Sequence, residues 1–260
     1  MINLIGLKVE PPLAELVIDR PEKRNAVSIN MWASIPNLVD KAESDDEVKV
    51  LIIHGGDAGA FAAGADIAEF EHTYATSDAA LKAGKTIAEA LAAIEDCTKP
   101  TIAAIEGACV GGGVSLAMAC DLRIAGTSAR FGITPGKLGL VYPAGDTRRL
   151  LAAIGPGAAK DVLFTGRIFS AREAADMRLI ERLSDDSRAL QTARDWALEI
   201  AATSQWSTRA IKQMIKGVQS GWADDDPAAV ALFIQGFSNS DFKDGYRAFL
   251  EKRPPRFVFK

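Results

Sequence analysis

The chain has 260 residues, of which 48% are hydrophobic and 25% are charged, a composition typical of a globular protein with an ample core. Its net charge of −4 is spread along the chain without a basic cluster, which argues against a nucleic-acid partner. No apolar run approaches the roughly 18 residues that cross a bilayer, and no secretory leader opens the sequence. We therefore expect a cytoplasmic protein with no membrane partner.

The cysteine and histidine content bears on metal and redox chemistry. Cys97, Cys109 and Cys120 are odd in number and lack C-x-x-C spacing, so neither a disulfide framework nor a zinc site is expected. With only His54 and His72, a multi-histidine metal centre is also disfavoured. These exclusions favour a small-molecule or protein partner.

Strand-like and helix-like segments alternate in the first half of the chain. Val9 falls in an expected first strand, and residues 13–18 are expected to form a second after a Pro-Pro turn. Ser28 is the expected N-cap of a helix in which Pro36 would cause a kink or a later start. Three further apolar runs are typical of buried strands: 48–54, 101–105 and 122–125. The alternation predicts an α/β domain.

The last third of the chain is predicted to be mostly helical. Five helices are expected from the pattern: 171–177, 188–202, 208–218, 227–237 and 241–252. This part also carries much of the aromatic surface: Trp196, Trp206, Trp222, Phe233, Phe237 and Phe249. Such a helical tail packs within the chain or forms a subunit interface. We expect a core over residues 1–200 and a helical C-terminal region over 201–260.

Two glycine-rich segments follow predicted strands, at residues 60–67 and 107–113. Small residues allow a ligand to approach the backbone, and a helix N-terminus presents unpaired N–H groups at its positive end. Two such N–H groups that converge would hold a carbonyl oxygen as it gains charge. The alternative is that both segments are tight turns that need glycine for packing. Neither contains the G-x-G-x-x-G spacing of a dinucleotide site.

A series of short motifs carries a resemblance to a known family. In order they are Arg20-Pro21, Asn25-Ala26, F-A-A-G-A-D-I at 61–67, K-P-T-I-A-A-I at 99–105, G-G-G at 111–113, A-C-D-L-R-I-A at 119–125, Phe131-Gly132, Thr165-Gly166, Glu173-Ala174 and F-L-E-K-R at 249–253. Their order and spacing resemble those of the enoyl-CoA hydratase/isomerase family, the crotonases, over essentially the whole chain.

The resemblance implies a spiral of ββα units with a helical C-terminal region that builds trimers, often paired into hexamers. It implies acyl thioesters of coenzyme A as substrates, with coenzyme A part of the substrate and no permanently bound cofactor. By position, the backbone N–H groups of Ala65 and Gly112 resemble the oxyanion hole that binds the thioester carbonyl in this family.

The resemblance also implies a surface for the coenzyme. Lys23 and Arg24 fall where the family lays the coenzyme, although two exposed cations in a loop are often simply solvated. Further coenzyme-binding positions are expected at Ala26, Ala63, Asp66 and Ile67, with Asp66 interpreted as a helix cap and not as a catalyst. Phe249 and Lys252 resemble residues that reach the coenzyme of a neighbouring subunit. Ala68 stands where the family often has a lysine, so one phosphate contact is expected to be missing.

The sequence departs from the family at the two glutamates with which hydratases activate water and protonate the α-carbon. Ser115 occupies the first position, two residues after G-G-G, and Pro135 occupies the second. Thioester binding and enolate stabilisation are therefore implied, whereas the usual proton transfer is not.

The segment after Pro135 offers a substitute. The pattern from Thr134 to Tyr142 resembles that of methylmalonyl-CoA decarboxylases, where the tyrosine adjoins the reacting carboxylate, although the histidine of those enzymes is Ala65 here. Decarboxylation needs no general base to start, only an oriented carboxylate, an oxyanion hole and then a proton donor. Tyr142 is thus either functional or a packing aromatic.

Other ionisable side chains near these motifs receive structural interpretations. Asp146 is expected to cap a helix over 147–154, and Arg148 and Arg149 to be surface charges. Glu69, Glu71 and His72 follow the first glycine segment and are the nearest ionisable groups in sequence to the expected oxyanion hole, on an expected solvated face; His54 is expected in the core. Two hypotheses follow: an acyl-CoA enzyme acting through an enolate, lyase or isomerase in type, or a family member that binds acyl-CoA without turnover.

Overall fold

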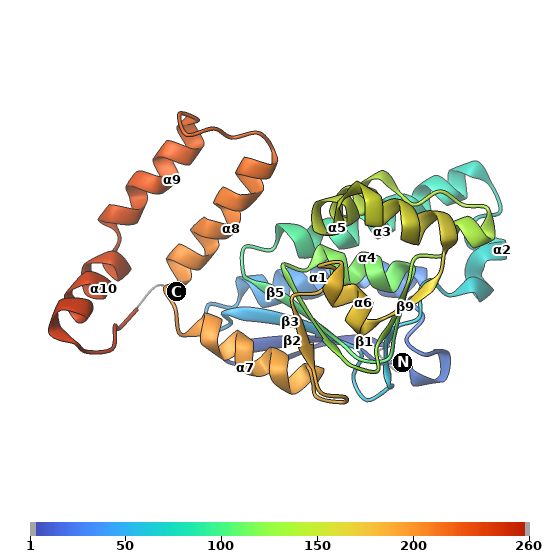
Figure 1. Ribbon diagram of the computed structural model, residues 1–260, viewed down its shortest axis with the longest axis horizontal. Helices are drawn as coiled ribbons and strands as arrows, with labels where there is room; N and C mark the ends of the chain where they lie inside the picture. The colour runs from blue at the N-terminus through green and yellow to red at the C-terminus, as the bar shows by residue number, and fades with distance from the viewer. Residues whose placement is uncertain (1–3, 258–260) are drawn as a thin grey trace.

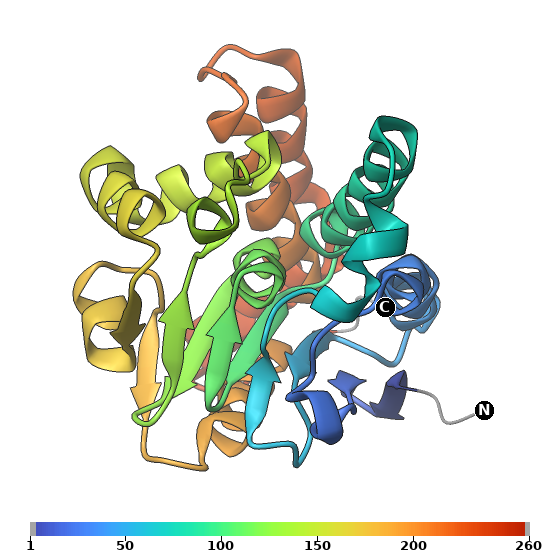
Figure 2. The ribbon, with the colours of Figure 1, turned by 90° about the vertical axis from the view of Figure 1, so that its right-hand side faces the viewer.

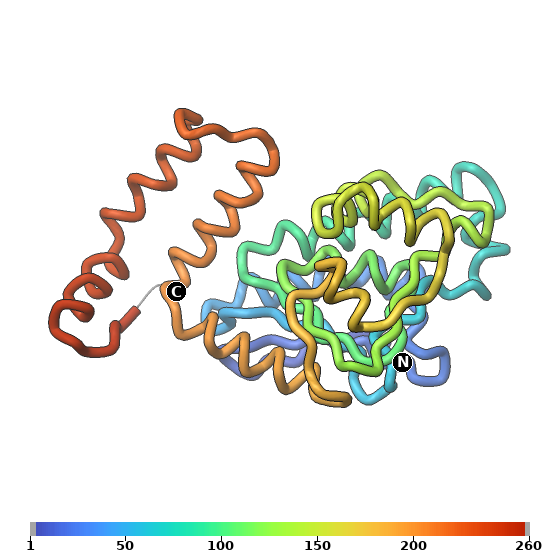
Figure 3. The backbone as a smooth tube through the Cα atoms, in the orientation of Figure 1, coloured from blue at the N-terminus to red at the C-terminus, as the bar shows by residue number. Residues whose placement is uncertain are grey.

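The computed structural model describes residues 4–257 and shows a body of sheets and helices from which three C-terminal helices extend (Figure 1). The smooth trace in Figure 3 shows the same division, with the last helices forming an arm beside the body. Within the described residues, no helix is long and apolar enough to span a membrane, and no group of three or more His, Cys, Asp or Glu side chains is arranged to hold a metal.

Six strands form the larger sheet in the order β1-β2-β3-β5-β7-β10. β1 and β2 pair antiparallel, and the remaining neighbours pair in parallel, with Leu16 opposite Ile53. The strands are β1 Ile5–Glu10, β2 Leu13–Ile18, β3 Val50–His54, β5 Thr101–Ile105, β7 Leu122–Gly126 and β10 Arg182–Ser184. The strands predicted from apolar runs are confirmed, because β3 and β5 are fully buried as continuous apolar runs require.

A second sheet has the order β4-β6-β8-β9. Its strands are β4 Ala60–Ala62, β6 Ala108–Val110, β8 Arg130–Gly132 and β9 Ile168–Ser170. Three successive units each place one strand in each sheet and then form a helix: β3-β4-α3, β5-β6-α4 and β7-β8-α5. This repetition is the predicted spiral of ββα units, and Figure 2 shows the helices above the strands.

Helices cover the two sheets. In the body they are α1 Ile29–Ser44, α2 Phe70–Thr73, α3 Ser77–Asp96, α4 Gly112–Ala119, α5 Ala144–Thr165, α6 Ala171–Asp176 and α7 Ala189–Ala201, with short 3₁₀ turns η1 Pro21–Lys23, η2 Ile67–Glu69 and η3 Pro135–Leu138. Ser28 caps α1 as predicted, accepting the Met31 N–H at 3.3 Å, and the helix continues through Pro36. Trp32 of α1 is fully buried in the main core.

The beginning of α5 differs from the expectation. Residues 147–154 are helical as predicted, and the helix is broken directly after them at Gly155 (φ 70°), but the predicted N-cap is wrong, because α5 begins at Ala144 after Pro143 and runs on to Thr165. Asp146 is therefore inside the first turn of the helix. Its side chain is buried against α4 instead of capping the backbone.

The arm consists of α8 Gln205–Gln219, α9 Pro227–Ser238 and α10 Ser240–Glu251. Lys212 of α8 attaches it to the body by bonding the Lys99 carbonyl at 3.2 Å and the Asp121 carboxylate at 2.7 Å. Large apolar side chains of the arm are exposed in the single chain, including Phe233, Phe237 and Phe249. The predicted helices are confirmed.

Candidate active site

A cavity of about 710 Å³ lies between the loop after β4, the start of α4, the helix α3 and the segment that leads into α5. The helices around it lie above the sheets in Figure 2. Its lining is largely apolar, from Trp32 at its floor to Leu140 and the strongly exposed Val141 at its rim. A cavity of this size and character fits a small-molecule site.

The Ala65 N–H group points away from Val27, and its nitrogen lies beside Gly112. The carbonyl of Gly64 accepts the Val27 N–H at 2.8 Å, and the two groups of a planar trans peptide point in opposite directions. The Ala65 N–H, which shares that peptide, therefore points away from Val27. Gly64 has φ +107°, a backbone conformation that residues with a Cβ rarely adopt, so the orientation depends on glycine.

Gly112 is the first residue of α4, so its N–H has no acceptor within the helix. A Cβ added to Gly112 would lie 3.2 Å from the Trp32 ring and 3.7 Å from the Ala65 nitrogen. The small space beside the Gly112 Cα atom therefore also borders the Ala65 nitrogen. Both residues line the cavity, and their main-chain donors come from two separate ββα units.

Gly113 has a different role from Gly112. A Cβ at Gly113 would lie 2.3 Å from the Ala62 carbonyl oxygen, a distance that would force the helix away from β4. The packing interpretation of the glycine run therefore holds at Gly113, whereas Gly112 borders the cavity, and the ligand-binding interpretation stays a prediction.

Three side chains form a hydrogen-bonded chain in the cavity wall. The Ser115 hydroxyl lies 2.9 Å from the Tyr142 hydroxyl and 3.0 Å from the Asp146 carboxylate. Ser115 comes from α4, Tyr142 from the segment before α5 and Asp146 from α5 itself. All three side chains line the cavity. Ser115, at the first lost glutamate position, is therefore hydrogen-bonded to the carboxyl group of Asp146.

Asp146 is 5% exposed and is held from its other side by Arg149, whose guanidinium donates to it at 3.2 Å. Arg149 also donates to Glu95 of α3 at 2.6 and 3.0 Å, so it is shared between two carboxylates. Burial raises the pKa of Asp146 above its ordinary value despite the bonds from Ser115 and Arg149. Burial also raises the pKa of the Tyr142 phenol.

Arg149, predicted as a surface charge, is half-buried and belongs to this network, whereas Arg148 is exposed.

Asp146 is the sole carboxylate, and Arg149 the sole cation, among the described residues that line the cavity. Pro135, at the second lost glutamate position, lines the cavity as the first residue of η3 and offers no acid or base. Sequence reasoning missed Asp146 because it assigned that residue to a cap. Pro143, a residue suited to a helix start, was the signal that the helix begins earlier.

The predicted coenzyme-binding residues are only partly brought together. Ala63 and Ile67 line the cavity. Asp66 caps η2 through the Ala68 N–H at 3.2 Å, as predicted, and its carboxylate is buried against Lys23 at 2.7 Å and Arg20 at 2.8 Å.

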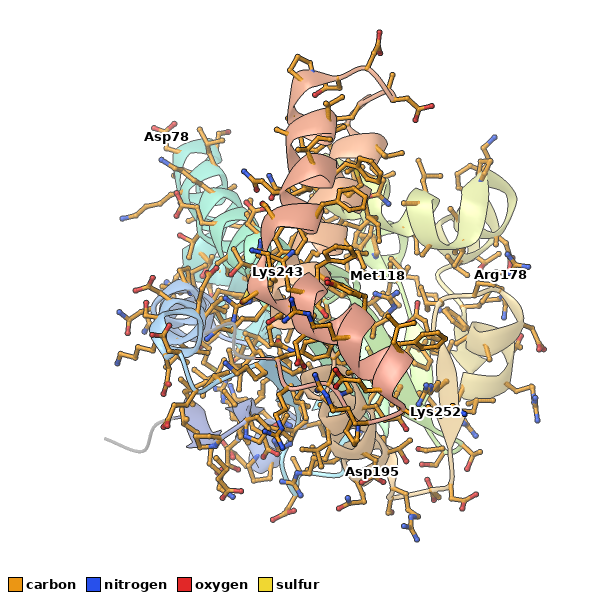
Figure 4. The ribbon with its side chains drawn as sticks, turned by 90° about the vertical axis from the view of Figure 1, so that its left-hand side faces the viewer. Asp78, Met118, Arg178, Asp195, Lys243 and Lys252 are labelled. Atoms are coloured by element: carbon orange, nitrogen blue, oxygen red, sulfur yellow. The ribbon has the colours of Figure 1, made fainter. Side chains whose placement is uncertain are left out.

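The remaining residues of this group lie away from the cavity lining. Arg24 is exposed with φ 49°, and the Ala26 carbonyl accepts a bond from Arg20. Phe249 and Lys252 lie at the end of α10, in the arm, and do not line the cavity of their own chain. Figure 4 shows Lys252 at that end of α10. The predicted contact of these two residues with a neighbouring subunit's coenzyme remains a prediction.

The other ionisable candidates lie outside the cavity. Glu69 accepts the Ile29 N–H at 2.9 Å, and neither Glu71 nor His72 is among the lining residues. His54 is buried as predicted, with its Nε2 atom 3.3 Å from the Glu15 carboxylate.

Comparisons with known proteins give the family. Residues 9–260 match the family model described as enoyl-CoA hydratase/isomerase. The chain is 35% identical over 262 residues to a crotonyl-CoA hydratase of Syntrophomonas wolfei, covering 99% of this chain and 98% of that protein. It is 33% identical over 256 residues to a short-chain-enoyl-CoA hydratase of Clostridium acetobutylicum, covering 97% and 96%.

Solved structures agree. A crystal structure of an enoyl-CoA hydratase/isomerase family protein from Hyphomonas neptunium superposes with a TM-score of 0.99 at 65% identity, covering 100% of this chain and 99% of that one. The fold and cavity thus define an acyl-CoA-processing enzyme class with the crotonase fold. The chain belongs to the enoyl-CoA hydratase/isomerase family.

Proposed function

We propose that the cavity binds an acyl-CoA thioester and stabilises its enolate between the Ala65 and Gly112 N–H groups. The observation that carries this proposal is the proximity of the two main-chain donors, which come from different ββα units and border the same cavity. The dipole of α4 adds to the Gly112 hydrogen bond as negative charge develops. The reaction is of the lyase or isomerase type.

The absence of both usual glutamates separates this site from a standard hydratase. Removing one positioned acid or base typically costs about 10²- to 10⁴-fold in rate, so ordinary hydration of a crotonyl thioester is expected to be very slow. Decarboxylation is the second candidate, favoured by the Tyr142 hydroxyl in the cavity wall at 2.9 Å from Ser115. A binding protein without turnover would have no need of the buried carboxyl that the cavity contains.

We also propose the placement of the coenzyme and the assembly. The coenzyme would pass along Ala63 and Ile67, near Asp66 and Ala26, with its phosphates toward Lys23 and Arg24. Phe249 and Lys252 would approach it from a neighbouring subunit, in a homotrimer or a hexamer. The exposed aromatic side chains of α9 and α10 support such an assembly because large exposed apolar patches mark interfaces. A monomer in sedimentation at micromolar concentration would contradict it.

The proposed oxyanion hole is tested by Gly112→Val. The added side chain would meet Trp32 and occupy the space of the carbonyl. Valine keeps the N–H but blocks access to it, and losing the use of one such donor corresponds to roughly 10²- to 10³-fold in turnover. Gly6→Val is the matched control, since a Cβ at Gly6 meets nothing within 4 Å. Binding of butyryl-CoA as tight as that of the parent in a folded Gly112→Val variant would place the carbonyl elsewhere.

A further inference from the structure

Three hydrogen-bonded side chains line the same cavity as the two backbone donors, and the innermost of them has no part in binding the thioester carbonyl. The chain runs from Tyr142 through Ser115 to Asp146, with oxygen separations of 2.9 and 3.0 Å. Both links are ordinary hydrogen bonds, short enough for a proton to pass along them.

The protonation of Asp146 determines the direction of both bonds. An ionised carboxylate only accepts, so Ser115 must donate its single proton to Asp146, and Tyr142 must then donate to Ser115. When Asp146 is protonated at the oxygen facing Ser115, the carboxyl donates to Ser115 and Ser115 donates to Tyr142. The Tyr142 proton is then free to face the cavity.

We infer that Tyr142 is the acid and base of this site and that Asp146, acting through Ser115, supplies and takes up its proton. This inference rests on the proposed function, because it needs an enolate held at Ala65 and Gly112. In the protonation direction, the Tyr142 O–H bond breaks as a C–H bond forms at the α-carbon. The Ser115 proton passes to Tyr142, the Asp146 proton passes to Ser115, and Asp146 is left ionised beside Arg149. Abstraction of an α-proton is the reverse.

The surroundings of Asp146 suit a group that cycles between two charge states. Ser115 of α4 and Tyr142 face it as neutral groups, Arg149 faces it from the next turn of α5, and Glu95 of α3 draws on the same guanidinium. Arg149 therefore compensates the ionised form without belonging to Asp146 alone. Burial raises the pKa of Asp146 above its ordinary value, and it also raises the pKa of Tyr142, so the phenol relays a proton and does not store charge.

Tyr142 is the catalytic residue in this scheme, and Ser115 and Asp146 act through it. The arrangement also explains Ser115 at the first lost glutamate position: a hydroxyl leaves room for the carboxyl of α5 to reach the same place in the cavity wall. Asp161, in the second half of α5, is an exposed carboxylate paired with Arg167 and gives a matched control on the same helix.

The test is the exchange of the α-protons of butyryl-CoA in D₂O, followed by ¹H NMR, which reports enolate formation whatever the later reaction. The parent should exchange these protons, and a plot of the exchange rate against pH should rise with a single inflection. Asp146→Asn and Ser115→Ala should each slow the exchange by about 10²- to 10⁴-fold and abolish the inflection, with the dissociation constant for butyryl-CoA nearly unchanged. Asp161→Asn should match the parent.

The outcomes separate the two proposals. Asp146→Asn or Ser115→Ala exchanging as fast as the parent, with the same pH profile, overturns the relay and leaves the oxyanion hole standing. A parent that binds butyryl-CoA without exchange also overturns the relay. A parent that does not bind butyryl-CoA removes the proposed function, and the relay with it. Ser115→Ala keeps the test decisive if Asp146→Asn does not fold.

Discussion

Glu15 of β2 and Asp146 of α5 are both buried carboxylates, but their surroundings differ in the balance of charge. Glu15 lies near His54 and receives two bonds from Arg194, at 2.6 and 2.9 Å, and contact with His54 followed by pairing with Arg194 lowers its pKa to about 2. Asp146 shares its one cation with Glu95, and burial raises its pKa. Fully compensated burial stabilises a fold, whereas partly compensated burial leaves a proton that can move.

The largest effect on stability is expected at Glu15. Glu15→Gln should lower the free energy of unfolding by about 3 kcal/mol at neutral pH, because it leaves Arg194 and His54 without their carboxylate. A lowered folded-state pKa stabilises the protein above the ordinary glutamate pKa and loses this contribution as pH falls toward 2. Urea unfolding at pH 7 and pH 3 should therefore show a smaller difference between parent and variant at pH 3. An equal difference would contradict the assignment.

A smaller effect of opposite sign is expected at Asp146. Asp146→Asn should raise the free energy of unfolding by up to about 1 kcal/mol at neutral pH, because it removes a carboxylate whose charge is costly to bury and leaves Arg149 paired with Glu95. A raised folded-state pKa favours the native state below the ordinary aspartate pKa and loses this contribution as pH rises. The advantage of the variant should thus vanish below about pH 4. Destabilisation at pH 7 would mean that Asp146 is a structural group like Glu15.

The smallest effect is expected at Asp161, whose pair with Arg167 is exposed. Asp161→Asn should change the free energy of unfolding by less than about 1 kcal/mol, because exposed pairs gain little in water. Its unfolding in high salt should resemble that of the parent. A larger loss would show that position on α5, and not burial, determines the effects at Asp146.

The two walls of the cavity also differ in how far the sequence could predict them. The backbone wall depends on glycine at Gly64 and Gly112, and the motif order that carries these residues was sufficient to place both loops. The second wall, formed by the side chains of Ser115, Tyr142 and Asp146, depends on where α5 begins. A three-residue error in the start of that helix turned Asp146 from a buried partner of Ser115 into an assumed cap, because helix boundaries depend on local packing that spacing does not show.

The ion pairs between distant segments could not be predicted from the sequence, because they also depend on packing. Arg149 meets Glu95, more than fifty residues away along the chain, only because the fold brings the end of α3 close to the first turns of α5. Strands β2, β3, β5 and β7 were predictable from apolar runs, which are local signals, whereas the repeated ββα unit was implied only by the family resemblance.

A crystal structure of the Asp146→Asn variant with butyryl-CoA tests the central claim most directly, because the variant should bind the thioester without exchanging its protons. We predict the thioester oxygen within hydrogen-bond distance of both the Ala65 and Gly112 nitrogens, with the α-carbon nearest the Tyr142 hydroxyl. A thioester oxygen bound away from these two nitrogens, or an α-carbon turned away from Tyr142, would contradict the account.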